Sequence, residues 1–579
     1  MCLPGTEITD AQVHPSGDFV SVLVTRPTDD GPVTDLRFFG VRDGSDVTLT
    51  FEAGLSGGRG LSGGMHVWRP DGAELLACCR DGRVVRAVFE DGAHAHSRAL
   101  EIPFGTSWST PQYSRDGNRV ALVADWTKLA VHNIAAAEWV TVHDAVDGYV
   151  MDAAWHRGAA TCHEWSRPEM AWTSSSVRGV TAEPGVAVQQ PRASLHHDAF
   201  GWITDVNGVA NVCIEGDGIV SETVIIADEC EHGGPTWGPG QRTWCFNSDG
   251  TKVAYTRNES GFGSLWVYDR LTQERRMVAR AVHGCLSWNG DTLASIRSGA
   301  RTPQQLVAYD VSDPANPVRV MTVSYADNRW GTEFDDELVE PTVHTADGVP
   351  YRLYEPRTPN GRLIAWVHGG PTDQWQVTWR PRFTYWLSRG YAIAVVDPRG
   401  STGFGRAHQM ALEGQWGSAD ADDLAVATRH AQQLLGVDPA RTVLMGGSAG
   451  GLTVLSAANR HAALAGCVVA LYPVVDLPLL LESDDPFEGH HNHVLIGDVT
   501  VSPNLHVRHL RDVPVLVFHG DRDELVVPEH SHRLERAVGA AGGNVRVTML
   551  EGEGHGIRAT ANIIREYAET EEFLRVCLP

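Results

Sequence analysis

One short phrase recurs through the first half of the chain and limits the folds that this half can adopt. Each copy places a polar turn, often Asp-Gly, before a run of β-forming residues, as in "VWRPDGAELLACC" at 67–79 and "CFNSDGTKVAYT" at 245–256. Asp-Gly and Asn-Gly supply the positive φ angles that hairpin turns require. The turn glycines of the successive copies are Gly17, Gly72, Gly117, Gly158, Gly208, Gly250 and Gly290.

These glycines follow one another at intervals of 40–55 residues. A period of about 40–50 residues with several short strands per repeat is typical of propeller blades. The copies at 153–165 and 202–214 are weaker than the other five. We therefore predict a β-propeller of about seven blades over residues 1–325, with a long β-sandwich or two smaller β domains as the alternatives.

The second half follows a different pattern. Apolar runs such as "GRLIAWVHGG", "GYAIAVVDPRG" and "VPVLVFHGDRD" alternate with amphipathic stretches such as "ADADDLAVATRHAQQLLG" at 419–436. Alternating strands and helices predict a mostly parallel sheet that is covered on both faces. The change falls between residues 322 and 340, and we predict an α/β-hydrolase domain over residues 326–579.

A candidate nucleophile lies in this second half, within "VLMGGSAGGL" at 443–452. Ser448 is the centre of a G-x-S-x-G motif that follows a predicted strand and precedes a predicted helix. This setting is what a nucleophile elbow requires, since its small neighbours let strand and helix approach closely. The alternative interpretation is a small residue in a tight turn.

A nucleophilic serine needs a base and an orienting acid, which in this fold follow it in the order Ser, Asp, His. His555 follows the strand-like run "VRVTMLEGEG", and Asp523 follows "VPVLVFHG". We predict His555 as the base and Asp523 as the acid. Asp521, in the same loop, and Asp476, in "YPVVDL", are the alternatives for the acid.

The sequence also offers groups for an oxyanion hole. "VHGGP" at 367–371 follows an early strand, and Gly369 and Gly370 can turn backbone N–H groups inward. Together with the N–H of Ala449 they would stabilise a tetrahedral oxyanion. We select Gly370 and Ala449 for this role and expect His368 to buttress the glycine loop.

The motifs of the second half resemble the prolyl oligopeptidase family of serine peptidases, closest to its acylaminoacyl-peptidase and bacterial dipeptidyl-peptidase-like branch. "HGGP", "DPRGSTGFG", "EGQWG", "GGSAGG", "HGDRDELVVP" and "GEGHG" stand in the order of that family. The resemblance implies that Ser448, Asp523 and His555 form the triad, because it places the acid three residues after the glycine of "HG". It also implies an N-terminal propeller and a catalytic α/β-hydrolase domain.

The chain departs from the family's pattern in the expected substrate pocket. No tyrosine follows "HGGP" closely, so backbone N–H groups are favoured for the oxyanion hole. The segment after the nucleophile helix carries leucines where proline-specific members have aromatic rings, and Leu525 replaces a basic residue. We predict an aliphatic pocket that includes Leu480, Leu481 and Phe487.

Charge and composition bear on partners and location. The formal net charge of −25 argues against nucleic acid or an anionic membrane as a partner. We expect no membrane span, no signal peptide, no cofactor and a cytoplasmic location with free thiols. The cluster "EGHHNH" at 488–493 fits no standard zinc spacing, so we expect a solvated loop near the substrate entrance and no metal. Homo-oligomers are common in the family, although no segment here specifies one.

The leading functional hypothesis is a serine peptidase for short or N-blocked peptides, with the propeller restricting access to the nucleophile. An esterase or amidase of the same fold acting on a specialised metabolite is the second hypothesis. A catalytically inactive binding protein is the third.

Overall fold

The computed structural model describes residues 5–28, 32–51, 54–56, 63–90, 93–180, 182–483 and 485–579. Met1–Pro4, the start of the stretch considered for a signal peptide, lie outside the described residues. Internal contacts divide the described chain into two compact units, Gly5–Asp327 and Asn328–Pro579. All nine cysteines in the described ranges are free. No helix among the described residues is long and apolar enough to cross a membrane.

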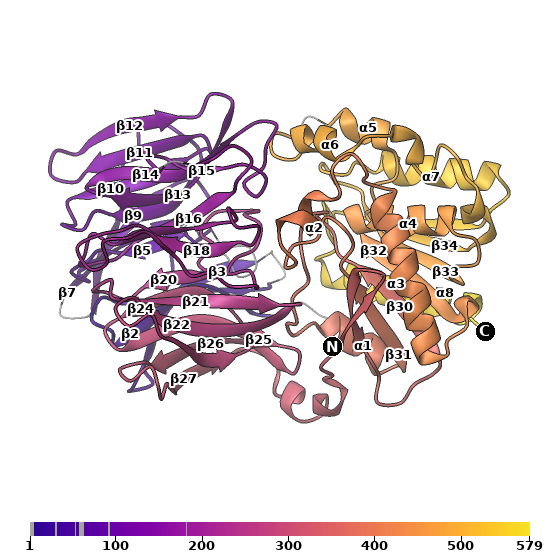
Figure 1. The fold of residues 1–579 in the computed structure, drawn as a ribbon, viewed down its shortest axis with the longest axis horizontal. Helices are drawn as coiled ribbons and strands as arrows, with labels where there is room; N and C mark the ends of the chain where they lie inside the picture. The colour runs from indigo at the N-terminus through magenta and orange to yellow at the C-terminus, as the bar shows by residue number, and fades with distance from the viewer. Residues whose placement is uncertain are drawn as a thin grey trace. The chain divides into compact units, whose positions relative to one another are not determined.

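The first unit is a β-propeller of seven sheets, as predicted (Figure 1). Successive strands pair antiparallel, so each sheet is a meander of consecutive strands. The first three sheets comprise β1 (Glu7–Val13), β2 (Phe19–Arg26), β3 (Val33–Gly40) and β4 (Asp46–Leu49); β5 (His66–Trp68), β6 (Glu74–Cys78), β7 (Val84–Glu90) and β8 (Ala93–Ala99); and β9 (Trp108–Tyr113), β10 (Arg119–Ala124), β11 (Lys128–Asn133) and β12 (Glu138–Asp144).

The remaining four sheets continue in chain order around the ring. They comprise β13 (Gly148–His156), β14 (Ala159–Ser166) and β15 (Ser176–Val177); β16 (Val188–Ala193), β17 (Phe200–Thr204), β18 (Asn211–Ile214) and β19 (Val224–Ile225); β20 (Trp244–Phe246), β21 (Lys252–Glu259), β22 (Phe262–Asp269) and β23 (Arg275–Arg280); and β24 (Val282–Asn289), β25 (Thr292–Gly299), β26 (Thr302–Asp310) and β27 (Val318–Ser324).

The seven turn glycines all have positive φ, between 55° and 84°. Six of them lie in the hairpin between the first and second strands of their sheets, which explains the repeated phrase. Gly208 is the exception, because it joins β17 to β18, the second and third strands of the fifth sheet. The copy at 202–214 is therefore displaced by one hairpin relative to the others.

The ring closes where the last sheet meets the first. The N–H of Val13 donates to Ser287 Oγ at 2.9 Å, and Asn289 Nδ2 donates to the carbonyl of Val13 at 2.8 Å. Thr292 Oγ1 donates to the carbonyl of Gly17 at 2.9 Å. Buried side chains of β1 and β2 pack with those of β24 and β25 in one apolar cluster. Each terminal sheet keeps its own strands, so side chains and these hydrogen bonds join the ends of the ring.

The first strands of most of the sheets contain the same irregularity, a β-bulge. In five of the described sheets the first strand has a register shift at a non-glycine residue with positive φ. Such bulges re-aim side chains and bend the strand. The residues are Asp10, Thr110, Asp152, Gln190 and Cys285.

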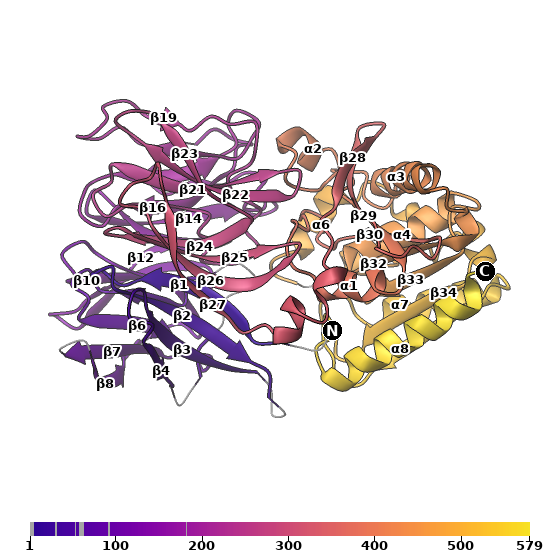
Figure 2. The same cartoon turned by 90° about the horizontal axis from the view of Figure 1, so that it is seen from below.

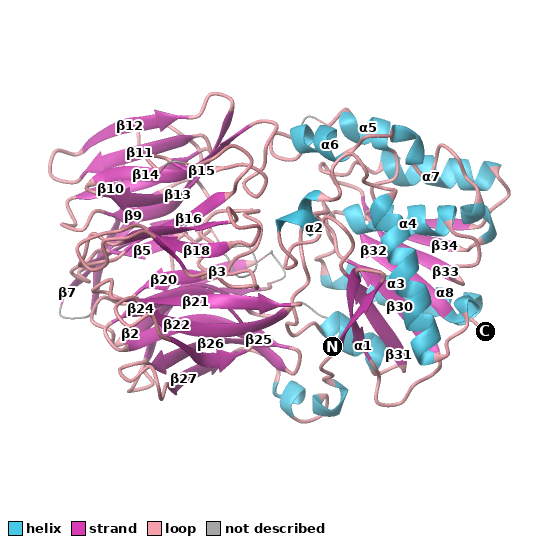
Figure 3. Ribbon diagram, in the orientation of Figure 1, coloured by secondary structure: helices cyan, strands magenta, loops and turns pink. Residues whose placement is uncertain are grey.

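The second unit is an eight-stranded sheet with helices on both faces (Figure 3). The strand order is β28-β29-β31-β30-β32-β33-β34-β35, and the pairs from β31 onward are parallel. The strands are β28 (Thr342–Ala346), β29 (Val349–Tyr354), β30 (Arg362–Val367), β31 (Tyr391–Val396), β32 (Thr442–Gly447), β33 (Cys467–Leu471), β34 (Val515–Gly520) and β35 (Val545–Leu550). The helices are α1 (Pro381–Leu387), α2 (Arg406–Met410), α3 (Ala419–Leu435), α4 (Ala449–Arg460), α5 (Leu477–Leu481), α6 (Gly489–Leu495), α7 (Glu529–Ala540) and α8 (Thr560–Cys577).

Alternate residues of each central strand enter opposite cores, as the apolar runs predict for a sheet buried on both faces. In β30, Leu363 and Ala365 pack with α3 and α4, whereas Ile364 and Trp366 pack with α1 and α8. Figure 2 shows α3 and α4 on one side of the strands and α8 along the other. This arrangement holds the carboxyl ends of the parallel strands at one edge, where the candidate site lies.

Candidate active site

Ser448 occupies a sharp turn between β32 and α4. Its φ of 55° and ψ of −123° lie outside the regions that a serine ordinarily adopts. The turn is possible because its neighbours lack side chains: a Cβ on Gly450 would lie 2.4 Å from the carbonyl oxygen of His368. A Cβ on Gly446 would lie 2.3 Å from the carbonyl oxygen of Gly450. The strand and helix therefore approach as a nucleophile elbow requires.

A continuous chain of hydrogen bonds links Ser448 to the two other predicted residues. His555 Nε2 lies 2.9 Å from Ser448 Oγ, and His555 Nδ1 lies 2.8 Å from Asp523 Oδ2. Asp523 follows the end of β34 and His555 follows β35, so neighbouring parallel strands deliver them to the same edge of the sheet. A serine–imidazole–carboxylate chain of this geometry can transfer the serine proton to the imidazole.

Asp523 is held in place by more than His555. Its Oδ1 accepts the N–H groups of Leu525 and Val526 at 3.1 and 2.9 Å, and the ring of His519 lies 3.4 Å from its Oδ2. Burial alone would raise the pKa of Asp523, but the hydrogen bonds from His519 and His555 outweigh it and hold the pKa well below its usual range. The carboxylate therefore stays ionised beside the imidazole.

The two alternative acids lie elsewhere. Asp521 Oδ1 accepts the N–H of Gly552 at 2.7 Å. Asp476 caps α5 by accepting the N–H of Leu479 at 3.0 Å, and it pairs with Arg533 at 2.9 Å. The structure gives neither carboxylate a hydrogen bond to His555 within the described residues. Both carboxylates stabilise local structure instead.

Gly370 and Ala449 both line the small cavity that contains Ser448. Ala449 is the first residue of α4, so its N–H has no partner inside the helix. It lies at the positive end of the helix dipole, which stabilises an anion. Gly370 has a φ of 127°, a conformation that an L side chain rarely adopts. These positions suit two backbone donors to an oxyanion.

His368 contacts the glycine loop, as expected. Its Nδ1 lies 2.7 Å from the carbonyl oxygen of Gly369, and its Nε2 lies 2.9 Å from Ser401 Oγ. The ring is 2% exposed and lies 4.0 Å from Asp397. It therefore fixes the loop that carries Gly370 from within the core.

The cavity beside Ser448 receives one of the three predicted pocket residues. Leu480 lines it, whereas Leu481 and Phe487 are absent from the described lining. Leu481 packs against the same apolar cluster from outside the cavity. The sequence pattern placed three residues of one segment together, but of the two leucines the short helix α5 turns only Leu480 toward the serine, and Phe487 lies beyond the end of this helix.

Several lining residues were not predicted. Trp416, Val474 and Val526 contribute apolar surface, and Asp485 and Glu488 contribute carboxylates. Leu525, which the sequence pattern placed in the expected pocket, also lines the cavity. Trp416 belongs to the "EGQWG" motif, and Val474 belongs to "YPVVDL", which follows β33. Neither motif by itself indicates a pocket residue. The cavity measures about 20 Å³, which is close to the space that one water molecule occupies.

Tyr472 is a further residue that sequence reasoning missed. Its ring packs edge-on against His555, and a Cβ on Gly447 would lie 3.2 Å from this ring. The available signal was its position directly after β33, at the same sheet edge as the other site residues.

The cluster "EGHHNH" does not form a solvated loop. Residues 489–493 belong to α6, in which His491 and Asn492 are buried. Glu488 and Asn492 line the cavity at Ser448. No group of three or more metal-binding side chains occurs among the described residues.

A mostly parallel sheet covered on both faces, with a serine elbow bonded to histidine and aspartate, defines the α/β-hydrolase class of fold. Residues 375–579 match the model of the prolyl oligopeptidase family. This match confirms the resemblance that the motifs of the second half indicate.

Curated relatives match parts of the chain. The acylamino-acid-releasing enzyme of Rattus norvegicus is 24% identical over 369 residues, which cover 58% of this chain and 49% of the relative. Dipeptidyl aminopeptidase BIII of Pseudoxanthomonas mexicana is 29% identical over 230 residues, which cover 37% of this chain and 33% of the relative. The chain spans about a third of the length of the first curated relatives it matches.

A solved structure matches the whole chain. The puromycin-hydrolyzing peptidase of Mycobacterium tuberculosis aligns with a TM-score of 0.81 at 23% identity, covering 99% of this chain and 94% of that one. This likeness extends the shared fold to the propeller.

Proposed function

We propose that the protein is a serine peptidase that hydrolyses short or N-blocked peptides through an acyl-enzyme. The hydrogen-bonded chain from Ser448 through His555 to Asp523 is the observation that carries this proposal. The match of residues 375–579 to the model of the prolyl oligopeptidase family supports it.

The proposed reaction has two stages. His555 Nε2 accepts the proton of Ser448 Oγ while the oxygen attacks the substrate carbonyl, and the imidazolium then gives that proton to the leaving amine. Water attacks the resulting ester with His555 again as the base, releasing the acid and restoring the serine. Asp523 keeps the N–H of Nδ1 in place and stabilises the imidazolium. The N–H groups of Gly370 and Ala449 would hold the oxyanion of each tetrahedral intermediate.

A fluorophosphonate probe tests the nucleophile. We expect stoichiometric labelling of the wild-type chain and none of Ser448→Ala. Labelling that persists in Ser448→Ala would locate the nucleophile elsewhere, and absence of labelling in both would favour the inactive binding protein.

Two carboxylates in the cavity bear on the substrate's amino end. Asp485 and Glu488 line the cavity together with Ser448, and carboxylates near a scissile bond favour an ammonium group over a blocked amine. Leucine p-nitroanilide and its N-acetyl derivative therefore form a matched pair of substrates. A preference for the free amine that disappears in Glu488→Gln would assign short unblocked peptides, whereas a preference for the acetylated compound would assign N-blocked ones.

We further propose that the propeller unit restricts substrates to short chains. The test compares the rates on folded casein and on a dipeptide amide. Equal rates would exclude the restriction without affecting the proposed triad.

The second candidate is an amidase or esterase that acts on a specialised metabolite. The name of the matched M. tuberculosis structure, a puromycin-hydrolyzing peptidase, and the leucine in the pocket favour it. A panel of acyl-amino-acid amides, dipeptide amides, simple esters and puromycin separates the candidates. Turnover of puromycin or esters far above that of every peptide amide would favour the metabolite.

A further inference from the structure

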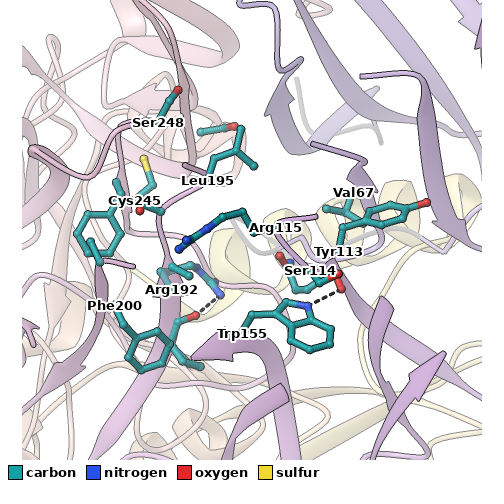
Figure 4. A pocket seen from close by; sticks show the side chains of 18 of the residues that line it. Val67, Tyr113, Ser114, Arg115, Trp155, Arg192, Leu195, Phe200, Cys245 and Ser248 are labelled. Atoms are coloured by element: carbon teal, nitrogen blue, oxygen red, sulfur yellow. Dashed lines mark hydrogen bonds between the residues drawn. The ribbon is translucent and has the colours of Figure 1, made fainter. Parts of the chain in front are cut away.

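The propeller unit contains a second cavity that the proposed reaction does not use. It measures about 540 Å³, and residues from the first strands and hairpins of all seven sheets line it (Figure 4). Ligand-binding cavities are typically about 300–1,000 Å³. We call it the propeller cup and define it by Arg115, Trp155, Arg192, Leu195 and Phe200, which line its wall.

Two backbone segments meet across the ring beside the cup. The N–H of Gly63 donates to the carbonyl of Gly240 at 3.0 Å, and the N–H of Gly240 donates to Asp152 Oδ1 at 2.7 Å. The N–H of Thr110 donates to the carbonyl of Gly64 at 2.6 Å. Gly63 precedes the second sheet and Gly240 the sixth, so these contacts join non-adjacent blades. Gly64, Thr110, Asp152 and Gly240 also line the cavity, so these contacts form part of its wall.

Arginines outnumber aspartates in the lining of the cup, although the chain as a whole is strongly negative. Five arginines line it against three aspartates, whereas the whole chain has a formal charge of −25. The arginines are Arg115, Arg119, Arg157, Arg192 and Arg242, and the aspartates are Asp116, Asp152 and Asp198.

Arg115, in the hairpin of the third sheet, and Arg192, on β16 of the fifth sheet, point into the same space (Figure 4). Arg115 Nη2 donates to the carbonyl of His197 and to Asp198, and these are the hydrogen bonds that the described structure gives its guanidinium. Arg192 donates to the carbonyls of Pro191 and Gln241, while its buried Nε has no partner within the described residues. Two guanidinium groups with unused donors that face one space create a site for an anion.

The other charges of the cup also have partners, and Arg115 itself is paired with Asp198 at 2.6 Å. Arg242 pairs with Asp10 at 2.8 Å, Arg157 pairs with Glu215 at 2.7 Å, and Asp116 accepts from Ser114 Oγ at 2.6 Å. Arg119 donates to the carbonyl of Gly158 at 3.1 Å. Asp152 accepts the N–H of Gly240 and also interacts electrostatically with the guanidinium of Arg192.

The wall beside these arginines is apolar. Trp155, Phe200 and Leu195 line the same cavity and are drawn around the two guanidinium groups in Figure 4. Trp155 is fixed, because its Nε1 donates to the carbonyl of Gln112 at 3.0 Å and Arg119 stacks over its ring at 4.6 Å. A ligand can therefore place an aromatic or aliphatic body against this wall.

We propose that the propeller cup binds a small organic anion, with a carboxylate or phosphate held by Arg115 and Arg192 and an apolar body against Trp155 and Phe200. The site lies within the propeller unit and is independent of the triad.

Calorimetric titration of the full Ser448→Ala chain tests the site, because this chain cannot turn the probe over. The probes are N-acetylphenylalanine, phenyl phosphate and the neutral N-acetylphenylalanine amide. We expect one of the anions to bind at least about 10-fold more tightly than the amide, since charge-assisted hydrogen bonds contribute about 1.5–3 kcal/mol each. The better of the two anions identifies the head group.

Substitutions then locate the binding. Arg115→Gln should weaken the anion about 10-fold or more, and Arg192→Gln should do the same if its melting temperature shows that it folds. Arg276→Gln, an exposed arginine on β23 outside the cup, is the matched control and should not change the affinity. Leu480→Trp, which fills the cavity at Ser448, should also leave it unchanged. Equal binding of the neutral amide, no binding of either anion at millimolar concentration, or unchanged affinity in Arg115→Gln would each overturn the proposal.

Discussion

The ring of Tyr472 packs edge-on against the imidazole of His555, with 4.9 Å between the ring centroids. Tyr472 holds this position in a strained conformation, with a φ of 37° and its N–H donating to Phe518 at 2.6 Å. The contact limits rotation of the imidazole between Ser448 and Asp523.

We expect Tyr472→Ala to lower kcat by about 10–100-fold, because small misplacements of a catalytic group are costly. Tyr472→Phe keeps the ring and should stay within about 3-fold of wild type. Steady-state kinetics on a p-nitroanilide substrate provide the measurement. A large loss in Tyr472→Phe would show instead that the hydroxyl takes part in the reaction.

The loop after β34 offers a matched pair of aspartates. Asp523→Asn should lower kcat about 10⁴-fold, because it favours the wrong tautomer of His555. Asp521→Asn should leave kcat within a few-fold, since that carboxylate accepts the N–H of Gly552. Comparing kcat and circular dichroism of both variants checks the assignment, and an equal loss in the two would contradict it.

Leu480 and Leu481 form a second matched pair for substitution. Leu480 is 6% exposed and lines the cavity at Ser448, whereas Leu481 packs outside it. Leu480→Ala should enlarge the cavity and raise kcat/KM for a large side chain relative to a small one by about 10-fold or more. Leu481→Ala should leave this ratio unchanged. Substrate series that differ only in side-chain size give the ratio, and an equal shift in both variants would refute the assignment of Leu480.

Asp420 on α3 predicts a pH dependence of stability. Its carboxyl accepts from Thr453 Oγ1 on α4 at 2.6 Å and from the N–H of Gly417 at 2.7 Å. Burial raises its pKa to about 6, so between about pH 4 and 6 the folded chain binds the proton that the unfolded chain has released. Stability should therefore fall as pH rises through this window, by about 3 kcal/mol from this group.

Asp420→Asn removes the titration while keeping an acceptor for Gly417. Its melting temperature should change less than that of the wild type between pH 4 and 6. Parallel melting curves of both proteins give the comparison. Identical pH profiles would show that the carboxyl of Asp420 does not titrate in this window.

Residue patterns predicted the fold because its turns depend on the backbone conformations that particular residues allow. Hairpin glycines require positive φ, and the glycines around Ser448 are needed for its turn, so both left clear signals. The repeat that contains Gly208 was misplaced by one hairpin, because a turn motif does not indicate which two strands of a sheet it joins. Tyr472 and Trp416 were missed because their roles depend on where segments that are distant in the sequence meet. The separation of Leu480 from Leu481 and Phe487 was missed for the same reason.

The contact between Gly63 and Gly240 gives the propeller a brace across its diameter. A Cβ on Gly240 would lie 2.1 Å from the carbonyl of Gly63, so no other residue fits there without moving the backbone. The seam between β1 and β24 relies on side chains and a few hydrogen bonds, yet an opening there leaves the second and sixth blades tied together. We therefore expect a transient opening of the ring to separate the first and seventh blades first, while the blades on the opposite side keep their arrangement.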